Sequence, residues 1–352
     1  MAVLRGQVGA RTGERVNILL CSVPFRPSVG GIETVSAILA ERFHAAGHRV
    51  TLLTQTPAAG PEAEPFTVVR RPRALALLRW VRWADVVVHN NVSLRLAWPL
   101  LLYRKPWVVA HHMWTPRAGR GALAGRLKHW VTRFATNIAV SRAMADSLVT
   151  PATVIPNPYA DDVFRFVPGV ARDGDVVFLG RLEPGKGAAV ALEAVARLNT
   201  GGKRVQLTVV GSGPEEPSLR RRAEALGVGD QVHLAGQRRG TELVALLNRH
   251  RVIAIPSLWE EPFGVVALEG VACGCVPVAA RSGGLPDAVG PCGVIVPKND
   301  GVALAAAIEA LLADGSARAT LLEQAPRHLA EHTRERIAHR YLEVIEHVYR
   351  IA

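Results

Sequence analysis

The stretch PSLWEEPFGVVALEGVACGCVPVAARSGGLPD, residues 256–287, is the most informative part of the chain. Its middle, Gly264 to Cys273, is apolar on almost every side, which predicts a buried helix. Because a carboxylate is almost never buried without a partner, Glu269 in this helix is expected to face a cleft or a ligand. Glu261 precedes the helix at a turn where free backbone N–H groups hold polar ligands well. A paired structural carboxylate and an acid that favours the helix dipole would explain the two glutamates as well.

Glu261 and Glu269 bracket seven residues, and the segment EPFGVVALE resembles the E-x7-E motif of retaining glycosyltransferases of family 4. The small-residue strand CGCVPVA and the turn SGGLP that follow strengthen the resemblance. It implies the GT-B fold, an α/β architecture of two facing Rossmann-like domains with parallel sheets and a cleft between them. It also implies that Glu261 binds hydroxyls of the donor sugar and that Glu269 binds the nucleotide ribose. The backbone of Phe263, Gly264 and Val265 would lie along the sugar.

Length and charge both divide the chain. With 352 residues it is expected to hold two domains. Residues 1–167 contain 21 Lys and Arg against 9 Asp and Glu, whereas residues 168–352 contain 21 of each. The first half carries the whole positive excess, which suggests that it faces a polyanion or an anionic membrane. The expected parts are a disordered leader at 1–15, an N-terminal acceptor domain at 16–167 with a crossover helix at 334–352, and a C-terminal donor domain at 168–333.

The first half alternates between strand and helix patterns. The predicted strands cover 16–21, 50–54, 85–89 and 106–112, and the predicted helices cover 32–46, 74–83, 94–103 and 117–134. Gly30 and Gly31 lie in the first strand-to-helix turn and resemble the family's GGxE loop. The resemblance implies that their backbone approaches the donor diphosphate and sugar.

Two histidines, His111 and His112, end the strand at 106–112. A histidine at the carboxyl end of a strand lies where ligands bind in open α/β sheets. The family has one histidine at this point, over the donor sugar. His111 is preferred because Met113 and Trp114 then fit the usual following residues, and His112 is the alternative.

The second half opens with a strand at 175–180, the loop GRLEPGKG and a helix at 188–198. Gly180 to Lys186 fits the P-loop pattern G-x-x-x-x-G-K, but Gly187 replaces the Ser or Thr that would bind magnesium. Arg181 and Lys186 instead resemble the family's cation pair that clamps the donor diphosphate, where two cations near a helix start would offset its charge. These residues require no metal or other cofactor. Asp287 stands where the family commonly has Glu.

The segment RRPRALALLRWVRW, residues 70–83, alternates cations with Leu, Val and Trp. Such a segment suits a membrane interface, although Leu and Trp could also form core while Arg faces water. Because no run reaches the roughly 20 apolar residues of a membrane span, any membrane contact is expected to be peripheral. The four cysteines fit neither a zinc site nor a disulfide framework, which predicts small buried residues in a reducing compartment.

The resemblance implies a retaining glycosyltransferase that moves a sugar from a nucleotide-diphosphate sugar to a lipid-linked or other glycan acceptor in cell-envelope polysaccharide synthesis. The expected catalytic residues are His111, Glu261, Arg181 and Lys186. The expected location is the cytoplasm, with peripheral contact at the anionic inner face of the cytoplasmic membrane. The alternatives are a soluble small-molecule acceptor, an inactive GT-B binding module and a P-loop NTPase. A nucleic-acid partner is not expected, because no nucleic-acid motif accompanies the charge.

Overall fold

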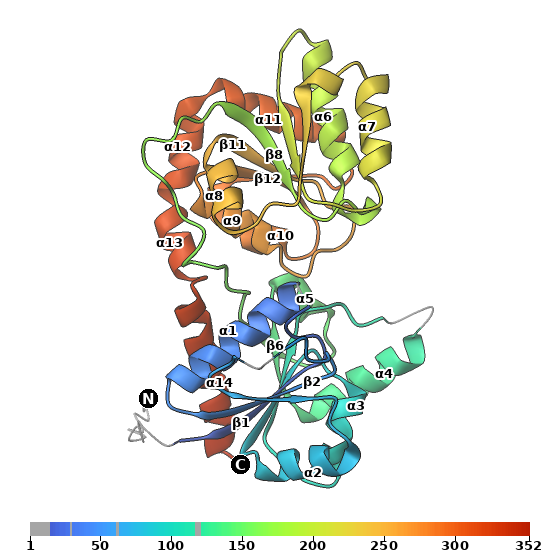
Figure 1. The fold of residues 1–352 in the computed structure, drawn as a ribbon, viewed down its shortest axis with the longest axis vertical. Helices are drawn as coiled ribbons and strands as arrows, with labels where there is room; N and C mark the ends of the chain where they lie inside the picture. The colour runs from blue at the N-terminus through green and yellow to red at the C-terminus, as the bar shows by residue number, and fades with distance from the viewer. Residues whose placement is uncertain (1–14, 29, 61–62, 117–120) are drawn as a thin grey trace, which may run out of the picture. The chain divides into compact units, whose positions relative to one another are not determined.

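The computed structural model describes residues 15–28, 30–60, 63–116 and 121–352. They form two parallel sheets flanked by helices, as expected for the GT-B architecture (Figure 1). The first sheet has seven strands in the order β3-β2-β1-β4-β5-β6-β7, and the second has six in the order β10-β9-β8-β11-β12-β13. The first sheet is built outward in both directions from β1, and the second sheet from β8. Each sheet therefore has a point where the strand order reverses, and open α/β sheets bind ligands there, at the carboxyl ends of the strands.

The strands of the first sheet are short and mostly buried. They are β1 (Asn17–Ser22), β2 (Arg49–Thr54), β3 (Thr67–Arg70), β4 (Val86–Asn90), β5 (Trp107–His111), β6 (Thr136–Ala139) and β7 (Ala152–Val154). The helices between them are α1 (Gly31–Ala45), α2 (Ala74–Trp83), α3 (Leu94–Ala97), the 3-10 turn η1 (Trp98–Leu101), α4 (Ala122–Val131), the 3-10 turn η2 (Thr132–Phe134) and α5 (Arg142–Ser147).

The second sheet consists of β8 (Gly174–Leu179), β9 (Leu207–Val210), β10 (Val232–Gly236), β11 (His250–Ile255), β12 (Val276–Ala280) and β13 (Val294–Val296). Its helices are α6 (Ala188–Thr200), α7 (Glu216–Ala225), α8 (Gly240–Asn248), α9 (Val265–Ala272), α10 (Leu285–Val289), α11 (Gly301–Ala313), α12 (Gly315–Glu323) and α13 (Ala325–Ala330). The last helix of the chain is α14 (Arg334–Arg350). Single 3-10 turns are η3 (Pro184–Lys186), η4 (Gly229–Gln231) and η5 (Gly290–Cys292).

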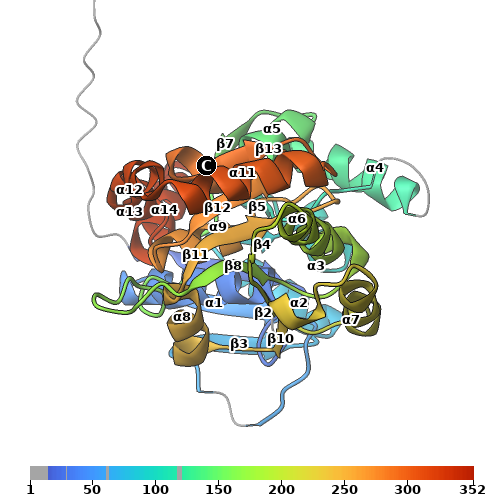
Figure 2. The ribbon, with the colours of Figure 1, turned by 90° about the horizontal axis from the view of Figure 1, so that it is seen from above.

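Both faces of the second sheet are covered by helices. Along β11, Val252 and Ala254 pack into one apolar cluster with α6, α7 and α11, whereas Ile253 and Ile255 pack into another with α8, α9 and α10. Figure 2 shows α11 and α8 on opposite sides of β8 and β11. Burial on both faces explains why the strand reads as a continuous apolar run rather than an alternating one.

The chain divides into two compact units, residues 1–109 with 342–352, and residues 110–341. The domain boundaries expected near residues 167 and 334 stay predictions. Within the described ranges, no helix has both the length and the apolar character needed to span a bilayer. The four cysteines are buried and unpaired, as expected, and burial raises the pKa of each thiol, so they stay protonated.

Two predicted helices differ from the structure. The helix expected at 94–103 is α3 followed by the 3-10 turn η1, because Pro99 has no N–H for continued α-helical bonding. The helix expected at 117–134 is described only from α4, which follows the left-handed Gly121 (φ 90°) and ends in η2. Arg117 and Arg120 lie outside the described residues, as does the leader apart from Arg15.

Candidate functional site

The switch point of the second sheet gathers most of the predicted donor-binding residues. Strands β8 and β11 are hydrogen-bonded neighbours. Arg181 and Lys186 follow β8, and Glu261 follows β11, so three residues separated by up to 80 positions reach one edge of the sheet. This is the edge at which an open α/β sheet binds its ligand.

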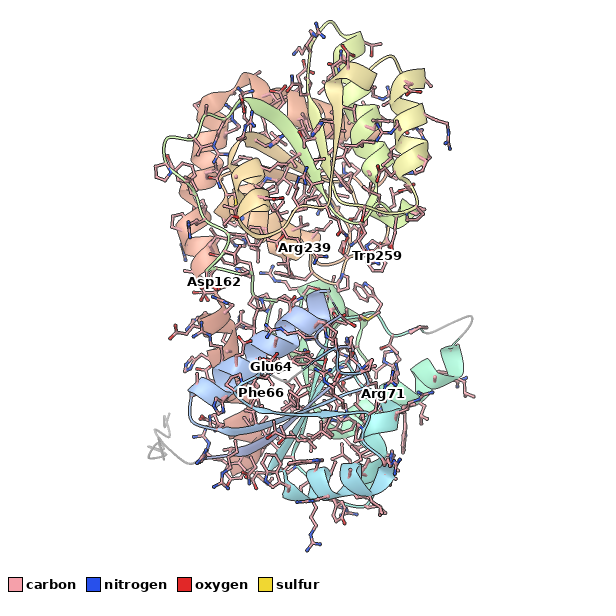
Figure 3. All side chains as sticks on the ribbon, viewed as in Figure 1. Glu64, Phe66, Arg71, Asp162, Arg239 and Trp259 are labelled. Atoms are coloured by element: carbon pink, nitrogen blue, oxygen red, sulfur yellow. The ribbon has the colours of Figure 1, made fainter. Side chains whose placement is uncertain are left out.

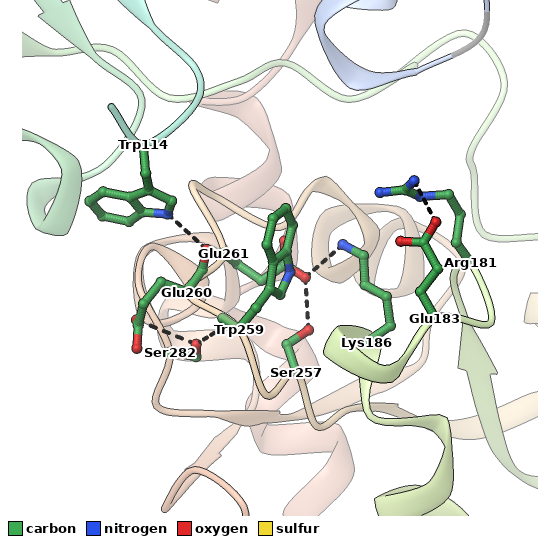
Figure 4. A network of polar contacts seen from close by, with 9 residues as sticks. All are labelled: Trp114, Arg181, Glu183, Lys186, Ser257, Trp259, Glu260, Glu261 and Ser282. Carbon is green, nitrogen blue, oxygen red and sulfur yellow. Dashed lines mark hydrogen bonds and ion pairs between the residues drawn. The ribbon is translucent and has the colours of Figure 1, made fainter. Parts of the chain in front are cut away.

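Lys186 and Glu261 form an ion pair, with Nζ and Oε1 2.8 Å apart (Figure 4). Ser257 Oγ donates a second hydrogen bond to the same oxygen at 2.7 Å. The ammonium also lies 4.9 Å from the ring centroid of Trp259, which is a cation–π distance. Both charged side chains are largely buried, with 22% and 10% exposed, so the pair is shielded from water. Sequence reasoning missed Ser257 and Trp259, whose only signal is their closeness to Glu261.

Arg181 lies in the same loop but differs in environment. Its guanidinium donates to Glu183 at 2.8 Å, and 65% of its side chain is exposed. Trp259, whose ring lies against Lys186, is 41% exposed and is labelled in Figure 3. The exposed Arg181 side chain is free to change rotamer toward an incoming anion, whereas the Lys186 ammonium is already held by Glu261. Binding of a diphosphate by both cations stays a prediction.

Gly187 bears on the P-loop alternative. Its backbone is left-handed (φ 77°), and an added Cβ would lie 2.0 Å from the carbonyl oxygen of Pro256. There is no space for the Ser or Thr hydroxyl that a P-loop places on magnesium. The strand–loop–helix junction therefore supplies cations and backbone N–H groups, without that metal ligand.

Helix α9 begins at the second half of the motif. Gly264 precedes it with φ 107°, a conformation that favours glycine, and Val265 is its first residue. The first N–H groups of a helix have no partner within it and favour anions or sugar oxygens. Glu269 lies four residues after Val265, hence on the same side of the helix. The positions expected to hold sugar and ribose thus share one surface.

Glu269 is largely buried, and burial raises the pKa of its carboxyl group to about 7. Among the described residues, no hydrogen bond to this carboxylate appears in the structure. A half-protonated acid without a protein partner is suited to accept hydrogen bonds from a ligand hydroxyl, which would restore its charged form.

The Phe263 side chain is buried in an apolar core cluster rather than exposed at the start of α9. It is 1% exposed and stacks on the His332 ring, with centroids 5.8 Å apart and planes 25° apart. His332 lies between α13 and α14, and sequence patterns gave no signal for it. Burial of the side chain leaves the backbone as the part of Phe263 that a donor could reach, and that contact stays a prediction.

His111 ends β5 and His112 follows it, and the two rings lie in different environments. His111 Nε2 is 2.9 Å from Asn137 Oδ1, and Asn137 is itself fixed by donating to Thr132 O and Ala135 O. His112 lies beside Asn157. Burial lowers the pKa of His111, and it lowers the pKa of His112 to about 4, so both rings are neutral at pH 7. Which one contacts a sugar stays a prediction.

Gly30 and Gly31 lie at the start of α1, in the unit that contains β1. Their contact with a donor stays a prediction. The parts of the chain that the structure describes gather no set of three His, Cys, Asp or Glu side chains able to hold a metal ion. Metal independence likewise stays a prediction.

Two family models match the chain. The model "Glycosyl transferases group 1" matches residues 162–328, and "Glycosyltransferase Family 4" matches residues 29–162. A phosphatidyl-myo-inositol mannosyltransferase from Mycobacterium leprae is 30% identical over 80% of this chain and 84% of its own length. A glycogen synthase from Mycobacterium tuberculosis is 29% identical over 86% of this chain and 87% of its own length.

A D-inositol 3-phosphate glycosyltransferase from Corynebacterium jeikeium is 36% identical over 49% of this chain. The match covers 47% of that protein, so this chain spans about half the length of such relatives. Among solved structures, Anabaena HepE in complex with UDP superposes with a TM-score of 0.80 at 22% identity. The superposition covers 94% of this chain and all of that one, and shows a shared fold.

Proposed function

The chain belongs to the glycosyl transferases of group 1, and from that premise we propose that it is a retaining enzyme using a nucleotide-diphosphate sugar. The observation that carries the proposal is the shielded pair of Lys186 and Glu261 next to the free N-terminus of α9. On this surface the Lys186 cation suits a diphosphate and its leaving oxygen. The Glu261 carboxylate and the backbone amides suit sugar hydroxyls. Structural relatives crystallised with UDP and UDP-glucose support this donor class.

In the proposed reaction, Lys186 and Arg181 bind the diphosphate and stabilise its charge as the bond to the sugar breaks. Glu261 and the backbone of residues 263–265 fix the sugar, and Glu269 binds the ribose. The leaving phosphate takes the proton from the acceptor hydroxyl on the same face of the sugar. Catalysis then depends on positioning and on electrostatic stabilisation, and no metal or other cofactor takes part.

A donor screen tests this proposal. The protein is incubated with UDP-, GDP- and ADP-sugars, with and without EDTA, and product mass and anomeric configuration are determined by mass spectrometry and NMR. Transfer with retained configuration in EDTA supports the proposal. Binding without turnover over a broad acceptor panel would instead favour an inactive binding module, and ATP hydrolysis would favour an NTPase.

The two glutamates are expected to act differently. Glu269→Gln should mainly weaken nucleotide binding, because the ribose contact is the same in ground and transition states. Glu261→Gln should lower kcat more than nucleotide affinity, because it orients the sugar. UDP affinity by calorimetry and kcat are measured for both variants; the reverse pattern would exchange their roles.

The pKa of about 7 for Glu269 adds a pH dependence to UDP binding. A carboxylate that accepts ribose hydroxyls must be ionised, so binding below pH 7 has to displace a proton. Affinity is expected to fall roughly tenfold between pH 8 and pH 6, since one pKa unit corresponds to about 1.36 kcal/mol. The phosphate of UDP also titrates near pH 6, so part of the pH dependence comes from the ligand. Glu269→Gln is the control: its UDP affinity should keep the pH dependence due to the phosphate and lose the part due to Glu269. An unchanged pH dependence in this variant would contradict the assignment.

We further propose a lipid-linked or other glycan acceptor at an anionic membrane surface, with a soluble small-molecule acceptor as the alternative. Residues 86–145 contain nine Lys and Arg and no Asp or Glu. On α4, every exposed large apolar residue lies on one stripe, together with the last residue of η2: Leu123 (82% exposed), Leu127 (46%), Trp130 (51%) and Phe134 (70%). A bilayer would desolvate such a stripe, which a nucleic acid would not.

Helix α2 has the same character in the other unit. Leu77 and Val81 face its core, whereas Leu75 is 81% exposed beside the exposed cations Arg79 and Arg82. The adjoining η1 ends at Leu101, and this residue and the following Leu102 are 79% and 65% exposed. The helix therefore buries only part of its apolar surface, which supports a membrane contact of this unit in its own right and not a purely structural role.

Vesicle co-sedimentation is expected to show binding that requires anionic lipid and fades with salt. Arg79→Glu with Arg82→Glu should weaken it at least tenfold, because each cation near the surface contributes about 1 kcal/mol. Leu127→Ser with Trp130→Ser should also weaken it, with less dependence on salt. Arg220→Glu with Arg221→Glu on the exposed side of α7 is the matched control and should bind normally. No binding to neutral or anionic vesicles would leave a soluble acceptor as the better proposal.

A further inference from the structure

Four consecutive carbonyl oxygens of the loop before α9 each accept a hydrogen bond from a different residue. The acceptors are Trp259, Glu260, Glu261 and Pro262, and the donors are, in that order, Ser282 Oγ (2.5 Å), Trp114 Nε1 (2.7 Å), Gly284 N (2.7 Å) and Ser141 Oγ (2.7 Å). Figure 4 shows the first two of these bonds. We call the four donors, Ser282, Trp114, Gly284 and Ser141, the carbonyl clamp. A loop held at four consecutive carbonyls has little freedom to rotate those peptide planes.

The donors Trp114 and Ser141 come from the loops after β5 and β6, and all clamp residues lie in the unit 110–341. Ser141 is also the N-cap of α5, because its Oγ accepts a hydrogen bond from Met144 N at 3.2 Å. One hydroxyl therefore accepts from the helix and donates to the loop, which fixes its rotamer from both sides.

Asp287 anchors the start of α5 next to this hydroxyl. Its Oδ2 accepts a hydrogen bond from the Arg142 backbone N–H at 2.6 Å, and its Oδ1 lies 3.7 Å from the Arg142 Nε. Asp287 belongs to α10, which follows the turn that contains Gly284. The residue that departs from the family's usual Glu thus has a defined contact in this chain.

Gly284 is required by space rather than by backbone conformation. Its φ is −84°, which any residue adopts. An added Cβ, however, would lie 2.4 Å from Pro262 O and 2.7 Å from Ser141 Cβ. The loop, the turn and the start of α5 are therefore packed against one another without a gap.

We propose that the carbonyl clamp, with Asp287 as its anchor, positions Glu261 and the N-terminal amides of α9 for transfer of the sugar. This inference rests on the proposed function for its effect on turnover. None of these residues is hydrogen-bonded to Lys186 or Glu269, and they reach Lys186 only through Glu261, so nucleotide binding should depend on them far less than turnover does. They are positioning residues, because they act through the backbone of residues 259–264. A loosened site would raise the activation free energy and so lower kcat.

The test compares Asp287→Ala, Asp287→Glu and Ser141→Ala by hydrogen–deuterium exchange, UDP affinity and turnover with the best donor from the screen. Asp287→Ala and Ser141→Ala are expected to speed exchange in the peptides covering 141–147 and 259–266, to lower kcat at least tenfold and to leave the Kd for UDP within twofold. Asp287→Glu keeps the carboxylate and should restore part of kcat.

Asp300→Ala is the matched control, because Asp300 also accepts hydrogen bonds at a helix start, from Val302 N and Ala303 N of α11. It should lower Tm without changing exchange at 259–266 or kcat. Unchanged exchange at 259–266 in both Asp287→Ala and Ser141→Ala would overturn the proposal, whatever reaction the protein catalyses. A parallel loss of UDP affinity would also overturn it, since the effect would then be general unfolding of the site. Altered exchange with no turnover in the unmodified protein would uphold the clamp and refute the proposed function.

Discussion

Lys186→Ala is expected to lower kcat/KM by roughly 10²-fold or more, which corresponds to about 2.7 kcal/mol of transition-state stabilisation. The ammonium is held at the sheet edge by Glu261 and the Trp259 ring, which is where the proposed reaction would develop diphosphate charge. Arg181→Ala is expected to have an effect of the same order. Steady-state kinetics with the best donor provide the measurement. Arg204→Ala, which removes an exposed Arg paired with Asp230, is the control.

The Lys186→Ala and Arg181→Ala variants are expected to differ in their free energy of unfolding. Lys186→Ala leaves the Glu261 carboxylate largely buried without its cation, which should cost about 1 to 3 kcal/mol. Arg181→Ala should cost almost nothing, because the bond to Glu183 is exposed. Lys186→Met with Glu261→Gln should regain stability but not activity. Near-normal turnover in both single variants, with the fold intact, would refute the diphosphate clamp.

Gly187→Ser is expected to destabilise the protein by about 2 to 4 kcal/mol. The left-handed backbone contributes part of this, and the collision with the Pro256 carbonyl contributes the rest. Gly202→Ser is a matched control, because Gly202 has φ 83° but nothing within 4 Å of an added Cβ. It should show only the backbone cost, about 1 kcal/mol. Denaturant unfolding measures both.

This serine variant also completes the P-loop pattern, so it tests that alternative directly. A stable Gly187→Ser protein with ATPase activity would show that the loop accommodates a magnesium ligand. The expected result is a destabilised protein that does not hydrolyse ATP.

The sequence was sufficient to predict the local elements that carry the candidate site: Lys186 follows a strand and Glu269 lies within a helix, as the apolar patterns predict. The roles of these residues depend on the family resemblance and stay predictions. The C-terminal helix is a further predicted element, which was expected at 334–352 and is found as α14 at Arg334–Arg350. Local rules failed where one residue changes the hydrogen bonding, as Pro99 does in the helix expected at 94–103.

Contacts made across long stretches of chain could not be predicted in this way. Ser141 meets Pro262 and Phe263 meets His332 through the packing of separate elements, and neither pair shares a periodic pattern. The choice between His111 and His112 is of the same kind. Adjacent strand residues point to opposite faces, so a shift of one residue in register reverses the answer.

The carbonyl clamp also constrains the order in which the protein can fold. Trp114 and Glu260 are 146 residues apart, and Arg142 and Asp287 are 145 apart. At typical synthesis rates the chain needs roughly 7 to 30 s to extend between such partners. During that interval the loops after β5 and β6 have no docking surface, and the apolar stripe on α4 is exposed on an incomplete protein. Assembly of the donor loop is therefore expected to be a late, high-contact-order step, and the nascent chain is most prone to aggregation just before it.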